Sequence, residues 1–454
     1  MAIRSINPAT GDVIETFAPA GEDEIEAALA KSADAFERHR RSGFADRARR
    51  LLAAADVLTQ EKERLARLVT EEMGKTLAAS AAEIDKCAWV CRYYAAHAEA
   101  FMRNAQLESD SLKSYIRYLP LGPLLAVMPW NFPFWQVFRC AAPAVMAGNV
   151  VLLKHASNVP RVALALQEIF AAADFAPGVF QTLLIEPRSV ETILADPRVK
   201  AATVTGSTRA GASVASIAGK HIKKTVLELG GSDAFIVMPS ANLDEAVEVG
   251  VKARTLANGQ SCIAAKRFIV HADVYDDYIE RFVGRFAALR LGDPLDAATD
   301  VGPLALARTR ERLDKQVTET LRQGAQRLTG AQSRDGPGNF YEPGVLAGIP
   351  AGSPCHDEEV FGPVALMFKA QSLEEAIAIA NDNRYGLGSA IWTNDRAEAE
   401  RAIDEIEAGA TFVNALVASD PRAPFGGVKS SGYGRELSKE GMHEFVNIKT
   451  VTIA

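Results

Sequence analysis

Between residues 122 and 237 the chain alternates short apolar runs with segments of helical spacing. The runs predicted to be strands lie at residues 124–128, 150–154, 180–185, 201–205 and 234–238. The predicted helices lie between them, at residues 134–147, 160–173, 189–195 and 209–218. Parallel strands need a crossover connection, which a helix supplies. The alternation therefore predicts an α/β fold with a doubly wound parallel sheet, which binds ligands beyond the carboxyl ends of its strands.

The same spacing rules describe the rest of the chain. Long helices are expected at residues 22–40, 45–73 and 77–103. A second series follows, with helices at 244–257, 275–289, 308–323, 373–381 and 396–406 and strands at 267–271 and 410–414. Segments 111–119 and 446–453 alternate in polarity, so we expect two strands that pair into an oligomerisation flap. Residues 418–434 are rich in Gly, Pro and Ser, which predicts a long functional or connecting loop.

Composition excludes several classes of protein. The 454 residues suffice for two or three domains, and the net charge of −7 argues against a general nucleic-acid binder. No apolar run is as long as a membrane span, and the N-terminus lacks the apolar segment of a secretory signal, so we expect a cytoplasmic protein. The five cysteines do not form a disulfide framework. Cys87 and Cys91 are expected in a core or interface rather than at a metal, and the histidines form no metal-binding pattern.

Cys262 differs from the other cysteines because the small and polar residues Gly259-Gln260-Ser261 precede it. Such a turn lets another molecule approach the sulfur closely. Upstream, Glu228 stands before a glycine pair. A thiol that attacks and a carboxylate that moves protons suit a two-step covalent mechanism. At this level a buried cysteine that acts as a small apolar residue explains Cys262 equally well.

Five further segments place polar groups at predicted strand ends or turns. Asn131 lies between two prolines, either as an oxyanion donor or as a satisfied turn residue. Ser207 lies between a strand and a helix, which suits a phosphate site or plain N-capping. Lys154 at a strand end either reaches a cofactor or is solvated, and Glu359 before a Phe-Gly-Pro turn is either a ligand or a rim residue. Segment 424–432 is either functional or only a flexible loop.

Together and in this order, these segments resemble the aldehyde dehydrogenase family from near the first residue to near the last. The motifs that carry the resemblance are Pro129-Trp130-Asn131-Phe132-Pro133, Thr205-Gly206-Ser207, Glu228-Leu229-Gly230-Gly231, Gly259-Gln260-Ser261-Cys262, Glu359-Val360-Phe361-Gly362-Pro363 and Pro424-Phe425-Gly426-Gly427. The resemblance implies a Rossmann-type NAD(P)-binding domain, an α/β catalytic domain and a small β oligomerisation flap. It places the cofactor domain at residues 1–102 and 121–230, the catalytic domain at 231–435, and the flap at 103–120 and 436–454.

The resemblance also implies a reaction, the NAD(P)-dependent oxidation of an aldehyde to a carboxylic acid. Cys262 is the expected nucleophile, and the Asn131 side chain with the backbone N–H of Cys262 is expected to hold the oxyanion. Hydride transfer to the nicotinamide then leaves a thioester on the cysteine. Glu228 is expected to activate the water that hydrolyses this thioester.

NAD or NADP is the implied cofactor. The residues carried over to its site are Trp130, Lys154, Gly178 and Ser207 for the adenosine and pyrophosphate, Glu359 for the nicotinamide ribose, and Phe361 near the ring. Ser157 stands where NAD-preferring members have a Glu that binds the adenine-ribose hydroxyls. A carboxylate there would repel a 2′-phosphate and Ser157 would not, so NADP is expected to be accepted, with or without NAD.

Within the family the chain resembles most the succinate-semialdehyde dehydrogenases. Arg139 lies two helical turns beyond the oxyanion residue and is expected to bind the distal carboxylate of a semialdehyde acid, although an ion pair also explains it. Leu256 stands where some members of the subgroup have a second Arg, so Ser419 and Arg422 are candidate replacements. Ala264 replaces the redox-switch cysteine of the subgroup, so we expect that switch to be absent.

Three other functions are conceivable for a chain with these residues. Trp135, Leu256 and Phe425 leave room for a less polar or aromatic aldehyde, so a broad-specificity aldehyde dehydrogenase is the alternative. A CoA-acylating enzyme is disfavoured because Glu228, the hydrolytic base, is present, and a non-catalytic protein is disfavoured because the catalytic residues occur together. The expected partners are a small aldehyde and further copies of the chain in a homodimer or homotetramer.

Overall fold

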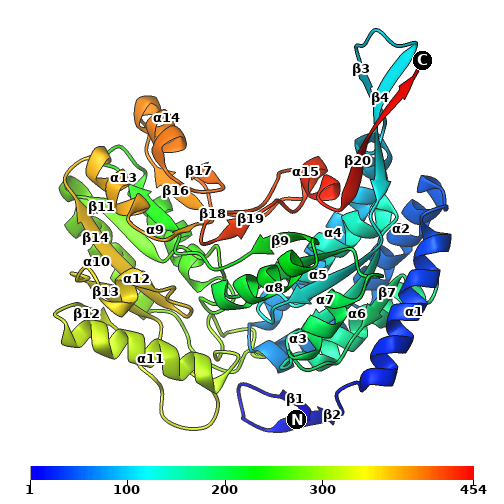
Figure 1. Ribbon diagram of the computed structural model, residues 1–454. Helices are drawn as coiled ribbons and strands as arrows, with labels where there is room; N and C mark the ends of the chain where they lie inside the picture. Colours follow the sequence, from blue (N-terminus) through cyan, green and yellow to red (C-terminus); the bar gives the residue numbers. More distant parts are fainter. Residues whose placement is uncertain (1) are drawn as a thin grey trace.

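The computed structural model describes residues 2–454, and the alternating region supplies the five parallel strands of a six-stranded sheet (Figure 1). The last strand predicted in that region, at residues 234–238, is instead β10 (Ala234–Val237) of a second sheet, where it pairs with β11 and β16. The strand order of the six-stranded sheet is β19-β9-β8-β5-β6-β7. The parallel strands are β5 (Pro123–Met128), β6 (Val150–His155), β7 (Phe180–Thr182), β8 (Ala201–Thr205) and β9 (Lys224–Glu228), and the short β19 (Gly432–Tyr433) pairs antiparallel with β9. The order of connection reverses between β5 and β8, which is where such sheets bind ligands.

Helices cover both faces of this sheet because successive strand residues point to opposite sides. Leu124 and Ala126 of β5 join the core on one face, whereas Leu125 joins the core on the other. The first core is built with α2 (Phe44–Gln60), α3 (Lys62–Met73), α4 (Leu77–Phe101), α5 (Trp135–Ala147) and α6 (Pro160–Ala172). The second is built with α1 (Glu22–His39), α7 (Ser189–Ala195) and α8 (Thr208–Lys220).

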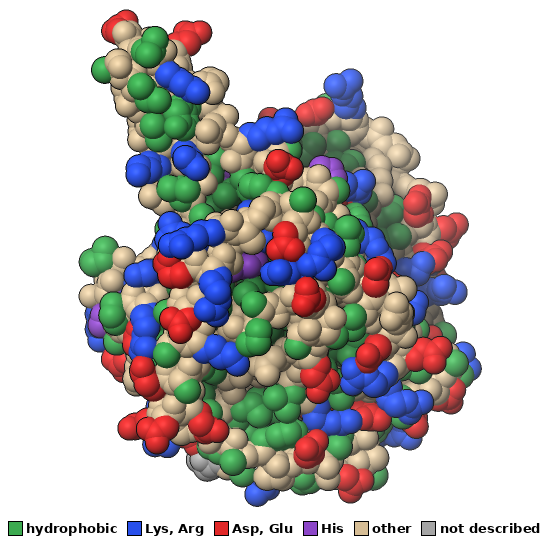
Figure 2. Space-filling model, turned by 90° about the vertical axis from the view of Figure 1, so that its right-hand side faces the viewer, with side chains coloured by type: hydrophobic (Ala, Val, Ile, Leu, Met, Phe, Trp, Pro, Cys, Tyr) green, Lys and Arg blue, Asp and Glu red, His purple; other side chains and the backbone are tan. Residues whose placement is uncertain are grey.

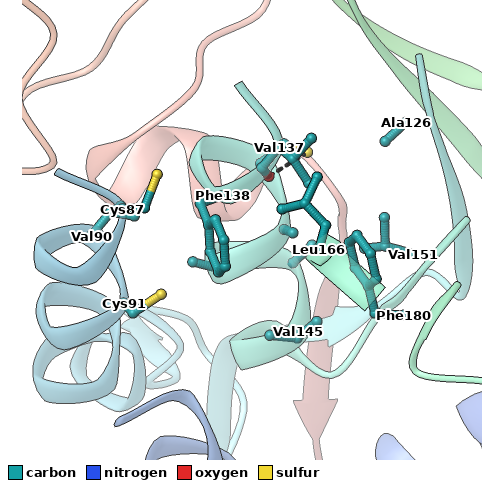
Figure 3. Packing of buried hydrophobic residues seen from close by; sticks show 14 of the residues in the cluster. Cys87, Val90, Cys91, Ala126, Val137, Phe138, Val145, Val151, Leu166 and Phe180 are labelled. Atoms are coloured by element: carbon teal, nitrogen blue, oxygen red, sulfur yellow. Dashed lines mark hydrogen bonds between the residues drawn. The ribbon is translucent and has the colours of Figure 1, made fainter. Parts of the chain in front are cut away.

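Figure 3 shows part of the first core, where Cys87 and Cys91 of α4 lie toward Phe138 of α5. Both cysteines are fully buried, and burial raises the pKa of each thiol. They are core residues, as one of the sequence interpretations held. Leu166 of α6 and Phe180 of the strand β7 belong to the same core.

A second sheet has the order β12-β13-β14-β11-β10-β16-β17, with all neighbours parallel except the edge strand β12. Its strands are β10 (Ala234–Val237), β11 (Arg267–His271), β12 (Gln326–Thr329), β13 (Gly344–Ala347), β14 (Val364–Ala370), β16 (Ser389–Trp392) and β17 (Thr411–Val413). The helical segments of this part are α9 (Leu243–Thr255), η1 (Ala272–Val274), α10 (Tyr275–Ala287), α11 (Ala307–Arg322), α12 (Pro354–Asp357), α13 (Leu373–Asn381) and α14 (Arg396–Glu405). The short segments β15 (Tyr385–Gly386), β18 (Val428–Lys429) and α15 (Ser438–His443) complete the chain.

Some elements differ from the sequence predictions. The helix expected at residues 45–73 is two helices, because the backbone of Glu61 departs from helical geometry, with φ −98° and ψ 15°. The N-terminal hairpin of β1 (Ile3–Ile6) and β2 (Val13–Phe17) was not predicted, because β2 is largely exposed and lacks apolar alternation. Strands β13 and β16 were also missed, because strands buried on both faces have no alternation to detect.

A three-stranded sheet projects from the body of the molecule (Figure 1). It consists of β3 (Ala105–Leu107), β4 (Lys113–Pro120) and β20 (Val446–Ile453). Strand β20 pairs antiparallel with all of β4, which confirms the pairing predicted from the two alternating segments. Figure 2 shows hydrophobic side chains on this arm, and Leu112 and Ile448 are 83% and 58% exposed. No helix within residues 2–454 is long and apolar enough to cross a membrane.

Candidate active site

The two sheets bring distant segments to one crevice. The turn that contains Asn131 follows β5, and Gly206 and Ser207 follow β8, on either side of the point where the strand order reverses. Glu228 is the last residue of β9, opposite Thr205 of β8. Cys262 comes from the second sheet, in the loop between α9 and β11. The crevice therefore collects the candidate catalytic residues from both halves of the molecule.

Two cavities meet at Cys262. The larger, of about 490 Å³, is lined by residues that follow strands β5 and β8. Trp130, Asn131 and Glu359 are among its lining residues. The smaller, of about 220 Å³, is bounded by α4, α5 and the loop of residues 418–434 (the late loop). Cys262 and Gln136 line both cavities. A sulfur at such a junction can face one molecule on each side, as the transfer of a hydride between two bound molecules requires.

The loop before Cys262 has a left-handed backbone at three successive residues. Ala257, Asn258 and Gly259 have φ values of 51°, 58° and 76°. A Cβ at Gly259 would stand 2.3 Å from the carbonyl carbon of Gly362, so only glycine fits there. The Asn258 amide donates to the carbonyls of Gly74 and Pro303 at 2.9 and 3.0 Å. These contacts hold a strained turn that carries the thiol.

Two buried cations, neither predicted from the sequence, also hold this loop. The Arg254 guanidinium donates to the carbonyls of Gly259, Gly362 and Ala265 at 2.6, 2.7 and 2.8 Å. The Lys266 ammonium donates to the carbonyls of Ser261 and Cys262 at 2.8 and 2.6 Å. It also lies 3.6 Å from a carboxylate oxygen of Glu359, so it connects the nucleophile loop to the larger cavity.

The thiol of Cys262 lies among charges of both signs. Burial raises the pKa of the Cys262 thiol to about 12, and the positive charges of Lys266 and Arg139 act against this rise. The Asn131 amide nitrogen donates to the carbonyl of Gln260 at 3.0 Å, which places it beside the nucleophile loop. The thiol therefore needs a proton acceptor or a further positive charge to react at neutral pH.

Glu228 is a buried carboxylic acid with free oxygen atoms. It is 2% exposed, and neither carboxyl oxygen has a hydrogen-bond partner among residues 2–454. Burial raises the pKa of the Glu228 carboxyl well above its usual range, against the opposing charge of Arg139. A Cβ at Gly426 would lie 2.7 Å from one of its oxygens, so the glycine leaves the space that the carboxyl occupies. A buried carboxyl without partners has its oxygens free to bind a water, and in its ionised form it can take a proton from that water.

Arg139 lines the smaller cavity, as the substrate prediction requires, but its charge is already paired. Its guanidinium forms a buried ion pair with Glu436 and donates to the Thr205 hydroxyl at 3.3 Å. It also stacks on the Phe425 ring, 4.5 Å from the centroid. Arg139 therefore forms an ion pair, as the alternative interpretation stated, and this pair is buried rather than on the surface of the helix.

A lysine that the sequence predictions omitted lies in the same cavity. The Lys86 ammonium donates to the Ser419 hydroxyl at 2.8 Å and lies 4.4 Å above the Trp135 ring. Leu256 and Phe425 also line this cavity. The cavity residues Ala79, Ala82, Glu83 and Lys86 follow the spacing of one helical face, and this pattern was a signal available in the sequence.

Arg422, the other candidate for the missing Arg, points elsewhere. It pairs with Asp420 at 2.6 Å and lies 5.6 Å above the exposed ring of Trp89. It is not among the residues that line the smaller cavity. Ser419 lines the cavity and Arg422 does not, so of the two only the serine is placed to meet a substrate there.

The predicted cofactor residues divide into two groups. Trp130, Ser207, Glu359 and Phe361 line the larger cavity, where Trp130 and Phe361 meet edge to face at 5.8 Å between centroids. The Ser207 side chain also caps the N-terminus of α8, as the N-capping interpretation predicted. The second group, Lys154, Ser157 and Gly178, does not line this cavity.

The second group lies near the end of β6 or against α1. Lys154 is the last residue but one of β6, and no hydrogen-bond partner of its buried side chain occurs in the described part of the chain. Burial lowers the pKa of Lys154. Ser157 is exposed just beyond that strand. Gly178 is buried, and a Cβ there would stand 2.5 Å from the Lys31 carbonyl oxygen, so it packs on α1.

Comparison with known proteins decides the family. The model of the aldehyde dehydrogenase family matches residues 1–451. The chain belongs to the aldehyde dehydrogenase family. Succinate-semialdehyde dehydrogenase [NADP(+)] 1 of Mycobacterium tuberculosis (strain ATCC 25618 / H37Rv) is 55% identical over 457 residues, which span the whole of both chains. A probable succinate-semialdehyde dehydrogenase [NADP(+)] of Synechocystis sp. (strain ATCC 27184 / PCC 6803 / Kazusa) is 52% identical over 454 residues, also over the whole of both.

Solved structures agree with the aldehyde dehydrogenase fold. The succinic semialdehyde dehydrogenase from Streptococcus pyogenes in complex with NADP+ superposes with a TM-score of 0.98 over the whole of both chains, at 38% identity. PnpE from Pseudomonas sp. WBC-3 superposes with a TM-score of 0.96 at 32% identity, over 99% of this chain and 94% of that one. The fold class predicted from the sequence is confirmed.

Proposed function

We propose that this aldehyde dehydrogenase oxidises succinate semialdehyde to succinate with NADP. The observation that carries the proposal is the position of Cys262 at the junction of two cavities, with the unpartnered, buried carboxyl of Glu228 one residue before Leu229, which lines the larger cavity. The substrate and cofactor are supported by full-length relatives at 52–55% identity that are named for succinate semialdehyde and NADP(+).

The residues of the larger cavity suit a nicotinamide dinucleotide. Trp130, Ser207, Glu359 and Phe361 would hold it, with Lys154 and Ser157 at its adenosine end. Lys154 is a buried cation that has no hydrogen-bond partner in the described chain, as a group that binds ribose hydroxyls or phosphate requires. When bound, the dinucleotide supplies a hydride acceptor.

The chain's own groups perform the remaining steps. The Cys262 thiol first gives up its proton to solvent, and the thiolate attacks the aldehyde carbon. The Asn131 amide with the Cys262 backbone N–H stabilises the developing oxyanion. Loss of hydride converts this adduct to a thioester on the cysteine. Glu228 then takes a proton from water, the hydroxide adds to the thioester carbon, and the carboxylic acid leaves as the thiolate is released.

The substrate class is tested by the ratio of kcat/KM for succinate semialdehyde to that for butanal, measured with NADP and with NAD. The two aldehydes have the same chain length and differ in the distal carboxylate. We expect a ratio of about 100 with NADP, because a charge-assisted contact is lost with butanal. Equal values for the two aldehydes would favour the broad-specificity alternative.

The cofactor assignment predicts the effect of a charge at Ser157. Ser157→Glu should lower kcat/KM for NADP about 10- to 100-fold and change that for NAD much less, because a carboxylate repels the 2′-phosphate. Steady-state kinetics with each cofactor at saturating aldehyde measure this. Ser157→Gln is the matched neutral control. If Gln and Glu lowered NADP use equally, bulk rather than charge would be the cause, and the assignment would be wrong.

We also propose that the projecting sheet of β3, β4 and β20 joins copies of the chain into a homodimer or homotetramer. The support is the exposure of Leu112 and Ile448 on this arm. With Leu107 and Ile453 they gather on this projecting arm, and apolar side chains gathered on one exposed surface are a common sign of an interface. Sedimentation equilibrium measures the state directly, and a monomer at micromolar concentration would contradict the proposal.

A further inference from the structure

The smaller cavity contains one cation, the Lys86 ammonium, that forms no ion pair with a carboxylate of the described chain. Among residues 2–454, no carboxylate oxygen lies within 4 Å of the Lys86 ammonium, and its hydrogen-bond partner is the neutral hydroxyl of Ser419. The ammonium lies over the Trp135 ring, and Leu256 adds a further apolar wall. A partly dehydrated charge among apolar groups is unfavourable until an anion joins it.

Arg139, on the neighbouring helix α5, already has a carboxylate partner. Its ion pair with Glu436 is buried, with both side chains 2–3% exposed, and the Thr205 hydroxyl accepts a further hydrogen bond. A substrate carboxylate that approached Arg139 would have to compete with Glu436. The two cations of the cavity are therefore not equivalent as anion ligands.

We infer that Lys86 is the principal ligand of the substrate's distal carboxylate, with the Ser419 hydroxyl as its second hydrogen-bond donor. Arg139 then mainly positions Phe425 of the late loop and Glu436, which pairs with Phe425. This inference rests on the proposed function and names the residue that makes it selective. An uncharged aldehyde would leave the Lys86 charge without a counterion. A carboxylate would neutralise it at the point where Trp135 already orients the ammonium.

The test is the selectivity of Lys86→Met, defined as kcat/KM for succinate semialdehyde divided by kcat/KM for butanal. Methionine keeps an unbranched side chain that is one heavy atom shorter, and it removes the charge. We expect the ratio to fall about 30-fold through a higher KM for succinate semialdehyde, the size of a lost charge-assisted hydrogen bond. Lys86→Arg, which keeps the charge, should retain most of the selectivity.

Lys62→Met is the matched control. Lys62 is an exposed lysine of α3 that pairs with Asp85 at 3.1 Å, outside the cavity. Its replacement removes the same charge from the protein and should leave the ratio unchanged. A ratio that falls equally in Lys62→Met and Lys86→Met would show a general electrostatic effect and overturn the inference.

The ratio also has a pH dependence. Burial lowers the pKa of Lys86 to about 8, and the charge of Arg139 on α5 lowers it further, against Asp420 in the late loop and Glu83 and Cys87 on α4. The ammonium is present below that pKa and lost above it, so the wild-type ratio should decline as pH rises through about 8. Ionisation of the shared nucleophile cancels in the ratio. In Lys86→Arg the ratio should stay flat to pH 9.5, and a parallel decline in both proteins would contradict the assignment.

The outcomes separate this inference from the proposed function. If the wild-type enzyme does not prefer succinate semialdehyde to butanal, the proposed substrate is wrong. If the wild-type enzyme shows the preference and Lys86→Met keeps it, only the role of Lys86 is wrong, and Arg139 is again the expected carboxylate ligand. A fall confined to Lys86→Met supports both.

Discussion

Cys262→Ala is expected to lower the rate of aldehyde oxidation by about 10⁴-fold or more, because no other group can form the covalent adduct. The measurement is NADPH formation at saturating succinate semialdehyde and NADP. Binding of NADP to the variant, followed by fluorescence, should persist and shows that the protein is folded. Residual activity within about tenfold of the wild-type enzyme would mean that Cys262 is not the nucleophile.

The same residue should dominate alkylation of the cofactor-free enzyme. Iodoacetamide is expected to modify one thiol per chain, because Cys87, Cys91, Cys140 and Cys355 are buried. The pKa of the Cys262 thiol is raised to about 12, so its thiolate fraction grows with pH throughout the accessible range. The alkylation rate should therefore rise about tenfold per pH unit between pH 7 and 9. A rate that levels off below pH 8 would contradict the raised pKa, and Cys262→Ala should remain unlabelled.

Glu228→Gln is expected to slow the steady state by about 10²- to 10⁴-fold while it preserves a first turnover. The amide has the shape of the carboxyl but cannot take a proton from the hydrolytic water. Rapid mixing should then show a burst of about one NADPH per active site, followed by slow turnover. Mass spectrometry after acid quench should find the acyl group on Cys262.

The absence of a burst would assign Glu228 to a step before hydride transfer rather than to hydrolysis. Glu228→Asp is the matched control, because it keeps the carboxyl and withdraws it by one methylene. The experiment also addresses the CoA-acylating alternative. If coenzyme A restored fast turnover in Glu228→Gln and also accelerated the wild-type enzyme, a thiol rather than water would be the natural acyl acceptor.

Local patterns were sufficient for many elements of the fold. Strands β8 and β11 begin and end where the sequence predicts, because apolar β-branched runs between polar turns are visible within a few residues. The split helix at Glu61 and the hairpin of β1 and β2 were not visible in this way. The break is a change in the backbone of a single residue, and β2 is largely exposed, so neither leaves an apolar period in the sequence.

The sequence by itself determined the fold class and the family, because the motifs around Asn131, Glu228 and Cys262 each require a short stretch of specific residues. It also identified Arg139 as a cation near the site. Only the tertiary structure decided that Glu436 neutralises Arg139 and that Lys86 is left without a counterion. The charge available to a ligand depends on which carboxylates lie within a few ångströms, and in this chain those carboxylates come from distant segments.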